Sequence, residues 1–130
     1  MTVERLCHLN NRGEKKCHGQ ILAEIYDLFT ELAVDVAVFV REKGFSRFPY
    51  ETQALFKVVG VADLAAWRAC KAEFVEIAPA TVKKLLTGSG KAGKEEVAAA
   101  LNRYVGKQKY ATDDESDAVA VGIAWLKDKG

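Results

Sequence analysis

Short runs of β-branched and aromatic residues alternate with longer segments of helical periodicity, and this alternation limits the fold more than any other feature of the chain. The strand-like runs lie at residues 3–9, 36–40 and 74–77, and the run at 36–40 has the length and composition of a buried strand. Strands that alternate with helices form a parallel or mixed sheet. The sequence therefore predicts an α/β fold, in which helices flank a mixed sheet.

The segments between and after these runs show apolar residues at helical spacing or signals that begin and end a helix. Ile21, Leu22, Ile25 and Phe29 share one face of the first segment. We expect helices over residues 19–32, 51–72, 79–86, 94–104 and 113–127. Three short strands make a thin sheet for this much helix.

Length and composition narrow the class of protein. The 130 residues fit one domain, residues 1–130, and a hydrophobic content of 49% supports a real core. A net charge of +1 gives no global attraction to nucleic acid or membrane. No segment has the length of a membrane span, and no signal peptide is visible. Three cysteines without framework spacing indicate reduced thiols in a cytoplasmic protein.

Basic residues gather in one stretch of the chain, directly before a run of acids. The basic residues are Lys83, Lys84, Lys91, Lys94, Arg103, Lys107 and Lys109, and the acids are Asp113, Asp114, Glu115 and Asp117. A basic surface beside an acidic cluster suits a metal-dependent nuclease. A solvated surface gives the same pattern, so charge alone leaves both interpretations open.

Asp114 and Asp117 are three residues apart at the start of the last expected helix, so both carboxylates share one helical face. Paired carboxylates on a rigid element suit hard cations such as Mg²⁺. Alternatively, Thr112 and Glu115 form a capping box, and acids in a first turn interact favourably with the helix dipole. Capping explains Asp117 poorly, because Asp117 leads into the apolar residues 118–121.

Two other motifs carry weaker signals. Cys7-His8 and Cys17-His18 suggest zinc, but their spacing is unlike that of known zinc sites. Residues 88–95 nearly match the phosphate-binding loop G-x-x-x-x-G-K-[ST]. Glu95 replaces the required hydroxyl there, and a helix precedes the loop where a strand is needed. We therefore expect neither zinc nor nucleotide binding.

A linked pair of motifs covers both the basic stretch and the acidic run. Residues 82–94 follow V-K-x-x-x-x-G-x-G-x-A-x-K, and residues 114–120 follow D-x-x-D-A-x-A. With this spacing the chain resembles the RuvC family of Holliday junction resolvases, and looks most like the divergent phage-type members. The resemblance extends back to about residue 21. It implies a ribonuclease-H-like fold and a homodimeric hydrolase of DNA recombination, an endonuclease that cuts four-way DNA junctions with Mg²⁺ (or Mn²⁺).

The resemblance also implies site residues. Two of the four acids of the family correspond to Asp114 and Asp117, and the acid that follows the strand before the long helix corresponds to Glu42. These three would be both catalytic and metal-binding, although Glu42 can also be read as an ordinary loop acid. DNA contacts are expected from Lys83 and Lys94, which match lysines of the family, and from Lys91 and Arg47. Phe45 and Phe48 beside Arg47 would stack on bases or pack locally.

The fourth acid of the family is an Asp on the first strand of the sheet, and no matching segment is visible here. The chain therefore resembles a RuvC-like domain without its first strand or two. The expected function is a metal-dependent junction endonuclease that cuts feebly or not at all. The alternative is a catalytically inactive junction-binding module or a mobile-element remnant.

The resemblance implies a homodimer, and the expected helix at 51–72 carries a stripe of small residues that could form the contact between the two copies. The stripe consists of Gly60, Ala62, Ala65, Ala66 and Ala69, which would let two copies of the helix approach closely. The alternative is that the same stripe simply covers the sheet.

Overall fold

A computed structural model describes residues 1–6, 16–33, 36, 38–43 and 49–129. The chain divides into two compact units. Unit 1 comprises Met1–His8, Val40–Lys43 and Glu76–Gly130, and unit 2 comprises Leu9–Phe39 and Gly44–Val75.

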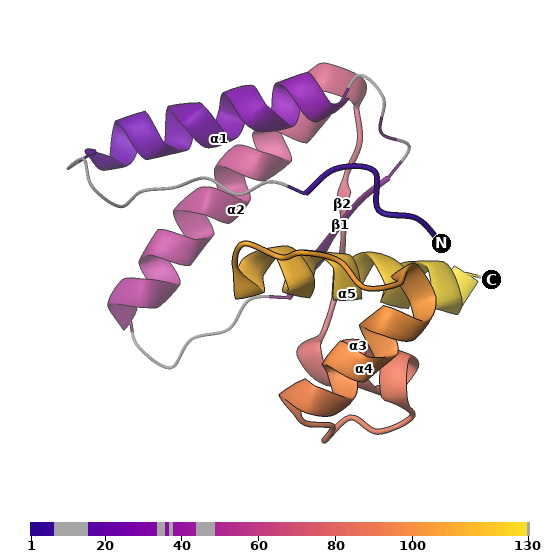
Figure 1. Cartoon of the computed structure of the whole chain (residues 1–130). Helices are drawn as coiled ribbons and strands as arrows, with labels where there is room; N and C mark the ends of the chain where they lie inside the picture. The colour runs from indigo at the N-terminus through magenta and orange to yellow at the C-terminus, as the bar shows by residue number, and fades with distance from the viewer. Residues whose placement is uncertain (7–15, 34–35, 37, 44–48, 130) are drawn as a thin grey trace. The chain divides into compact units, whose positions relative to one another are not determined.

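Unit 2 is built from two helices, α1 (His18–Leu32) and α2 (Pro49–Cys70), which pack against each other (Figure 1). Three aromatic rings gather in its core, with the Phe39 centroid 6.0 Å from that of Phe29 and 5.1 Å from that of Phe74. Ala33 and Ala66 are buried beside these rings. Both helices were predicted from the periodicity of the sequence, and the structure confirms them.

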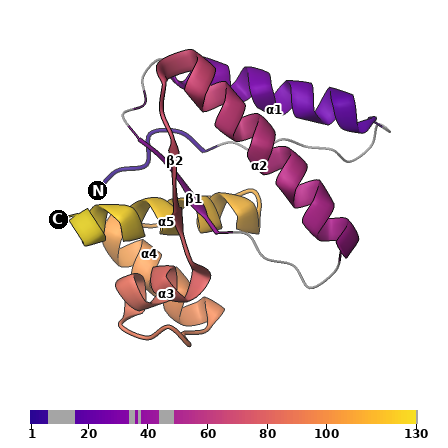
Figure 2. The same cartoon turned by 180° about the vertical axis from the view of Figure 1, so that it is seen from behind.

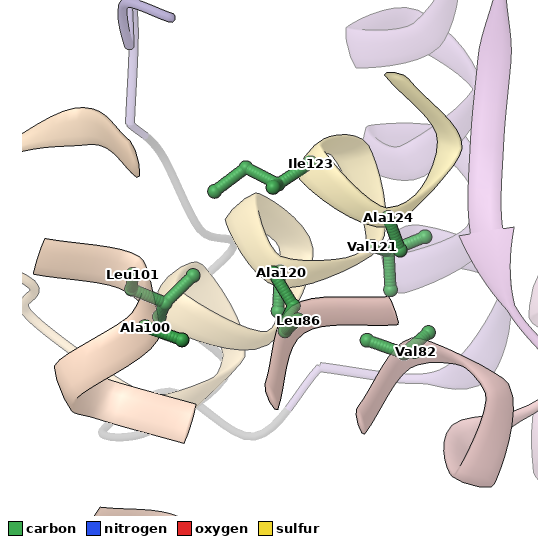
Figure 3. Close-up of a cluster of buried hydrophobic side chains, with 8 residues drawn as sticks. All are labelled: Val82, Leu86, Ala100, Leu101, Ala120, Val121, Ile123 and Ala124. Carbon is green, nitrogen blue, oxygen red and sulfur yellow. The ribbon is translucent and has the colours of Figure 1, made fainter. Parts of the chain in front are cut away.

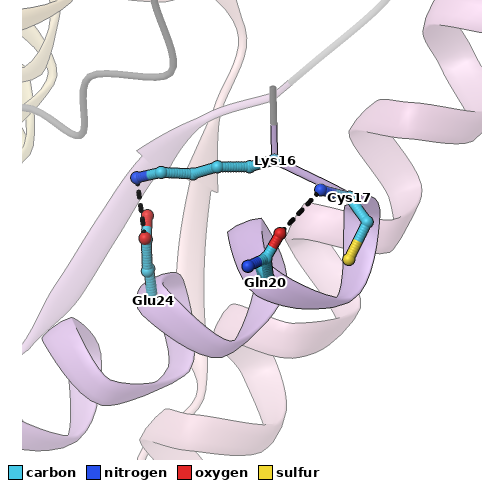
Figure 4. A network of polar contacts seen from close by, with 4 residues as sticks. All are labelled: Lys16, Cys17, Gln20 and Glu24. Atoms are coloured by element: carbon cyan, nitrogen blue, oxygen red, sulfur yellow. Dashed lines mark hydrogen bonds and ion pairs between the residues drawn. The ribbon is translucent and has the colours of Figure 1, made fainter. Parts of the chain in front are cut away.

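The first turn of α1 is held by polar contacts (Figure 4). The backbone N–H of Cys17 donates to Oε1 of Gln20 at 3.0 Å, and Lys16 forms an ion pair of 2.8 Å with Glu24. Lys57 of α2 donates to Nδ1 of His18 at 3.3 Å. Cys17 and His18 thus serve local structure. Cys7 and His8 lie outside the described residues.

The strands β1 (Phe39–Glu42) and β2 (Phe74–Ile77) pair in a two-stranded sheet. Phe39 lies beside Phe74 at one end, and at the other end the N–H of Lys43 donates to the carbonyl oxygen of Ile77 at 2.8 Å. Because matching ends lie side by side, the strands are parallel. The helix α2 connects them, as parallel strands require.

The structure confirms the strand predicted at 74–77 and corrects two others. The prediction of a strand at 36–40 was wrong in its bounds, because Val36 packs onto the aromatic core while pairing begins only at Phe39. The strand predicted at 3–9 is absent over residues 3–6, which have no sheet partner, and residues 7–9 lie outside the described residues.

Unit 1 contains three further helices, α3 (Pro79–Thr87), α4 (Lys94–Val105) and α5 (Asp113–Lys129), all of them predicted. The helix α5 packs against α3 and α4 (Figures 1 and 2). Figure 3 shows the buried side chains between them, which are Val82, Leu86, Ala100, Leu101, Ala120, Val121, Ile123 and Ala124. Within the described part of the chain, no helix has the length and apolar character needed to cross a membrane.

A lysine near the end of α5 fastens this helix to its two neighbours. Nζ of Lys127 donates to the carbonyl oxygen of Leu85 at 2.6 Å and lies 5.0 Å from the ring centroid of Tyr104. Leu85 belongs to α3, which ends at Gly88 with a left-handed φ of +88°. These contacts add to the apolar core, so α5 is a firmly held support for the acids on its first turns.

Candidate functional site

Asp114 and Asp117 lie on the first turns of α5, and both are exposed. Four and seven residues after Asp117, on the same helical stripe, come Val121 and Ala124, which are buried in the core of unit 1. Asp117 is therefore exposed but lies on the same side of α5 as these buried residues. This position explains why it stands directly before an apolar run, which capping alone did not explain.

The electrostatic environment connects Asp117 with the other predicted acids. Burial raises the pKa of Asp117, and the charges of Asp114 and Asp113 raise it further, whereas Lys94 lowers it. Burial also raises the pKa of Glu42, followed by the charge of Asp117, whereas Lys83 lowers it. We call Glu42, Asp114 and Asp117 the acidic group. Asp117 is its central member, because its charge interacts with both of the others.

Glu42 is the last residue of β1 and is exposed. Because β1 begins at Phe39, Glu42 stands at the carboxyl end of the strand and not in the loop after it. The backbone of the next residue, Lys43, is tied to Ile77 of β2, which anchors this end of the strand.

Two of the predicted DNA-binding lysines adjoin the acidic group. Lys83 lies on α3, and its charge lowers the pKa of Glu42. Lys94 is the first residue of α4, and its charge lowers the pKa of Asp117. Both side chains are exposed. Each therefore provides positive charge beside one acid of the acidic group. Arg47, Phe45 and Phe48 lie outside the described residues.

Lys91 lies in the connection between α3 and α4, which is an ordered turn. Its N–H donates to Oγ of Ser89 at 3.3 Å, and the N–H of Ser89 donates to Oγ1 of Thr87 at 3.2 Å. A Cβ atom at Gly90 would lie 3.3 Å from the carbonyl oxygen of Ala80. The close approach favours glycine at this position, and the turn presents the exposed Lys91 side chain to solvent.

The chemistry of the acidic group fits a divalent cation. All three side chains offer carboxylate oxygens, the ligands that Mg²⁺ prefers. Burial and then repulsion between neighbouring carboxylates raise the pKa values of Glu42 and Asp117, and a cation would relieve the repulsion. Among the described residues, no three His, Cys, Asp or Glu side chains are close enough to hold an ion together. The acids therefore share a neighbourhood without forming a preassembled set of ligands.

A family profile described as "Crossover junction endodeoxyribonuclease RuvC" matches residues 19–125. The chain belongs to the RuvC family. The match includes β1, β2, the acidic group and Lys83, Lys91 and Lys94. The family predicted from the linked motifs is thus confirmed.

Curated RuvC proteins show the extent of the similarity. Relatives from Ehrlichia ruminantium and Prochlorococcus marinus are 32% and 30% identical, over 88% and 92% of this chain. The matches cover 72% and 75% of those proteins. A relative from Sulfurovum is 34% identical over 62% of the chain, and this match spans about half, 52%, of its length.

Two solved structures confirm the fold. The Thermus thermophilus RuvC structure matches with a TM-score of 0.78 at 22% identity, over 88% of this chain and 71% of that one. T. thermophilus RuvC in complex with a Holliday junction substrate matches with a TM-score of 0.81 at 21% identity, over 90% and 73%. The predicted ribonuclease-H-like α/β fold is therefore confirmed.

Sequence reasoning proposed the acidic group and Lys83, Lys91 and Lys94, and these assignments stay predictions. It interpreted Glu115 as an ordinary helix cap, yet this residue is only 5% exposed. The i to i+3 pattern with Thr112 predicted the cap and gave no sign of burial.

Proposed function

We propose that this chain binds four-way DNA junctions and hydrolyses a phosphodiester bond in them with a divalent cation, Mg²⁺ or Mn²⁺. The observation that carries the proposal is the placement of Asp114 and Asp117 on the first turns of a helix that is packed into the core of unit 1, with Glu42 at the end of β1. The effects of Asp117 and Lys83 on the pKa of Glu42, and of Lys94 on that of Asp117, support it. Membership of the RuvC family gives the reaction class. The T. thermophilus relative, solved with a Holliday junction, supports the choice of substrate.

The lysines would bind the DNA, and the acids would bind the cation. Lys83, Lys91 and Lys94 would contact phosphates, which gives affinity that depends on salt and carries little sequence information. Asp117 would hold the cation together with Glu42 and Asp114. When bound, such a cation supplies positive charge that lowers the pKa of a water ligand and stabilises the leaving oxygen. Lys83 and Lys94 also favour the ionised form of the acids beside them.

We expect the 130-residue chain to cut slowly. The resemblance calls for a fourth acid on a first strand, and the described residues do not bring three metal-type ligands together. Because catalytic groups that act as a unit fail non-additively, the single-turnover rate should be on the order of 100-fold or more below that of T. thermophilus RuvC under the same conditions. Rates are measured on a labelled junction with Mn²⁺. A rate equal to that of the Thermus protein would show that another residue completes the site.

A second candidate function is junction binding without cleavage. The absence of a preassembled set of ligands among the described residues favours it. The two candidates differ in one observable, because only the endonuclease produces cut strands that require both a divalent cation and Asp117.

We also propose a homodimer, formed through the exposed side of α2. Phe56, Leu64 and Trp67 are 64%, 48% and 49% exposed, and they lie on one side of the helix around the exposed Gly60. Large apolar side chains grouped in this way are typical of interfaces.

The small residues that were expected to form the dimer contact are less accessible, since Ala62, Ala65 and Ala66 are buried within the chain. We therefore propose the dimer contact through the exposed apolar side chains and not through these three alanines.

Replacing Trp67 with aspartate should weaken dimerisation by at least about 30-fold, because a buried aromatic residue at an interface commonly contributes 2 kcal/mol or more. Light scattering over a concentration series measures the effect. Leu126→Asp is the matched control, because Leu126 is an exposed apolar residue on α5. A wild-type chain that stays monomeric at high concentration would rule out the dimer. An equal effect of both substitutions would show that another surface is used.

A further inference from the structure

Glu115 stands out in the first turn of α5. It is the single buried charged residue in the described part of the chain, with 5% of its surface exposed. Its Oε1 accepts the backbone N–H of Ala111 at 3.1 Å. The N–H of Glu115 in turn lies 3.4 Å from Oγ1 and 3.2 Å from the carbonyl oxygen of Thr112. The side chain thus joins the segment before the helix to its first turn.

Capping alone does not require this burial. An exposed carboxylate can accept a backbone N–H, whereas a buried one loses the hydration of a full charge. The helix α4 avoids this loss of hydration, since it begins without a side-chain cap and keeps Glu95 and Glu96 of its first turn exposed. The buried carboxylate is found instead on α5, the helix that carries two members of the acidic group.

The position of Glu115 around the helix axis indicates which part of α5 its side chain fixes. At 3.6 residues per turn, Glu115 lies about 160° from Asp117 and about 100° from Asp114. Its hydrogen bond with the N–H of Ala111 therefore holds the first turn of α5 on the side of the helix opposite Asp117. The first turn of a helix lacks internal partners for its N–H groups and frays unless it is capped. Asp114 lies in that turn, and Asp117 follows it directly.

We propose that Glu115 is a positioning residue, which fixes the first turn of α5 and thereby sets where Asp114 and Asp117 present their carboxylates to a divalent cation. The proposal rests on the proposed function, because it concerns the same metal site. In this role Glu115 is not itself a ligand of the cation. Its effect passes through the backbone from Ala111 to Asp117.

The test measures Mn²⁺ affinity, from the electron paramagnetic resonance signal of free Mn²⁺, in the full chain and four variants. Glu115→Ala removes the acceptor for the Ala111 N–H, while Glu115→Gln keeps an acceptor oxygen and loses the charge. Glu96→Ala removes one exposed charge from α4 and serves as the charge control. Asp117→Asn marks the loss of the site. We expect about tenfold weaker binding in Glu115→Ala, and affinities within about threefold of the charge control in Glu115→Gln.

Hydrogen exchange of the backbone N–H groups from Ala111 to Asp117 gives a second readout that needs no metal. Exchange should be at least about tenfold faster in Glu115→Ala than in Glu115→Gln. Thr112→Ala, which removes only the longer contact, should shift both readouts in the same direction by less and remains available if Glu115→Ala does not fold.

The outcomes distinguish the positioning role of Glu115 from the proposed metal site. Equal Mn²⁺ affinity and equal exchange in Glu115→Ala and the Glu96→Ala control would overturn the positioning role. Wild-type affinity no better than that of Asp117→Asn would overturn the proposed metal site, and the exchange rates would then decide alone whether Glu115 fixes the turn.

Discussion

Replacing Asp117 with asparagine is expected to weaken Mn²⁺ binding by at least about tenfold and to remove junction cleavage. Asparagine keeps the size of the side chain but loses the charge and one carboxylate oxygen, the ligand type that Mg²⁺ and Mn²⁺ prefer. The effect should exceed those of Asp114→Asn and Glu42→Gln, because Asp117 interacts electrostatically with both other acids.

Asp128→Asn is the matched control for this change, since it makes the same chemical substitution at an exposed position near the other end of α5. Titration with Mn²⁺ should give wild-type affinity for this control. If Asp117→Asn bound Mn²⁺ as tightly as Asp128→Asn, the acidic group would not be a metal site.

The same substitution should stabilise the metal-free protein at neutral pH. The pKa of Asp117 is raised above its ordinary value of 3.8, by burial and then by Asp114 and Asp113. An acid with a raised pKa contributes stability that is fully present below that ordinary value and is lost as pH rises through the folded-state pKa. Asp117→Asn avoids this loss, so its thermal midpoint at pH 7 should exceed the wild-type midpoint by about 2 °C. The difference should shrink towards pH 4 and reverse in sign with saturating Mn²⁺, as thermal scans with a chelator or Mn²⁺ would show.

Changing Lys83, Lys91 and Lys94 together to alanine should reduce affinity for a four-way junction on the order of 100-fold at 0.1 M salt. Each lysine that meets a phosphate releases counterions, so the plot of log affinity against log salt should also become less steep by about 2–3. Gel-shift titrations at several salt concentrations measure both quantities.

The control for this triple variant carries the same loss of charge on other exposed lysines, Lys84, Lys107 and Lys129. It should lose much less affinity and keep nearly the wild-type salt dependence. Equal losses in the two triple variants would mean that the chain attracts DNA by its general charge and that the surface beside the acidic group has no special role.

Local patterns in the sequence predicted the five helices of the described residues and proposed part of the site. Helical periodicity and the glycine and proline signals predicted α1, α2, α3, α4 and α5, while the linked motifs proposed Asp114, Asp117 and the lysines. The bounds of β1 were missed because an apolar run such as residues 36–40 can pack on a core without pairing in a sheet, and Val36 does so.

What the sequence could not give depends on contacts between distant segments. The coupling of Glu42 to Asp117 joins a strand to a helix more than seventy residues later, and the family resemblance alone suggested it. The burial of Glu115 and the inward position of Ala62, Ala65 and Ala66 depend on which side of each helix meets the rest of the chain. A capping pattern or a stripe of small residues is compatible with either side.

The most direct test of the Asp117-centred site is cleavage of a labelled four-way junction by the wild-type chain and by Asp117→Asn, each with Mn²⁺ and with a chelator. We predict slow accumulation of cut strands by the wild-type protein with Mn²⁺, and none above the protein-free background in the other three reactions. Equal traces of product from the wild-type chain and Asp117→Asn with Mn²⁺ would contradict the endonuclease proposal and leave junction binding as the function.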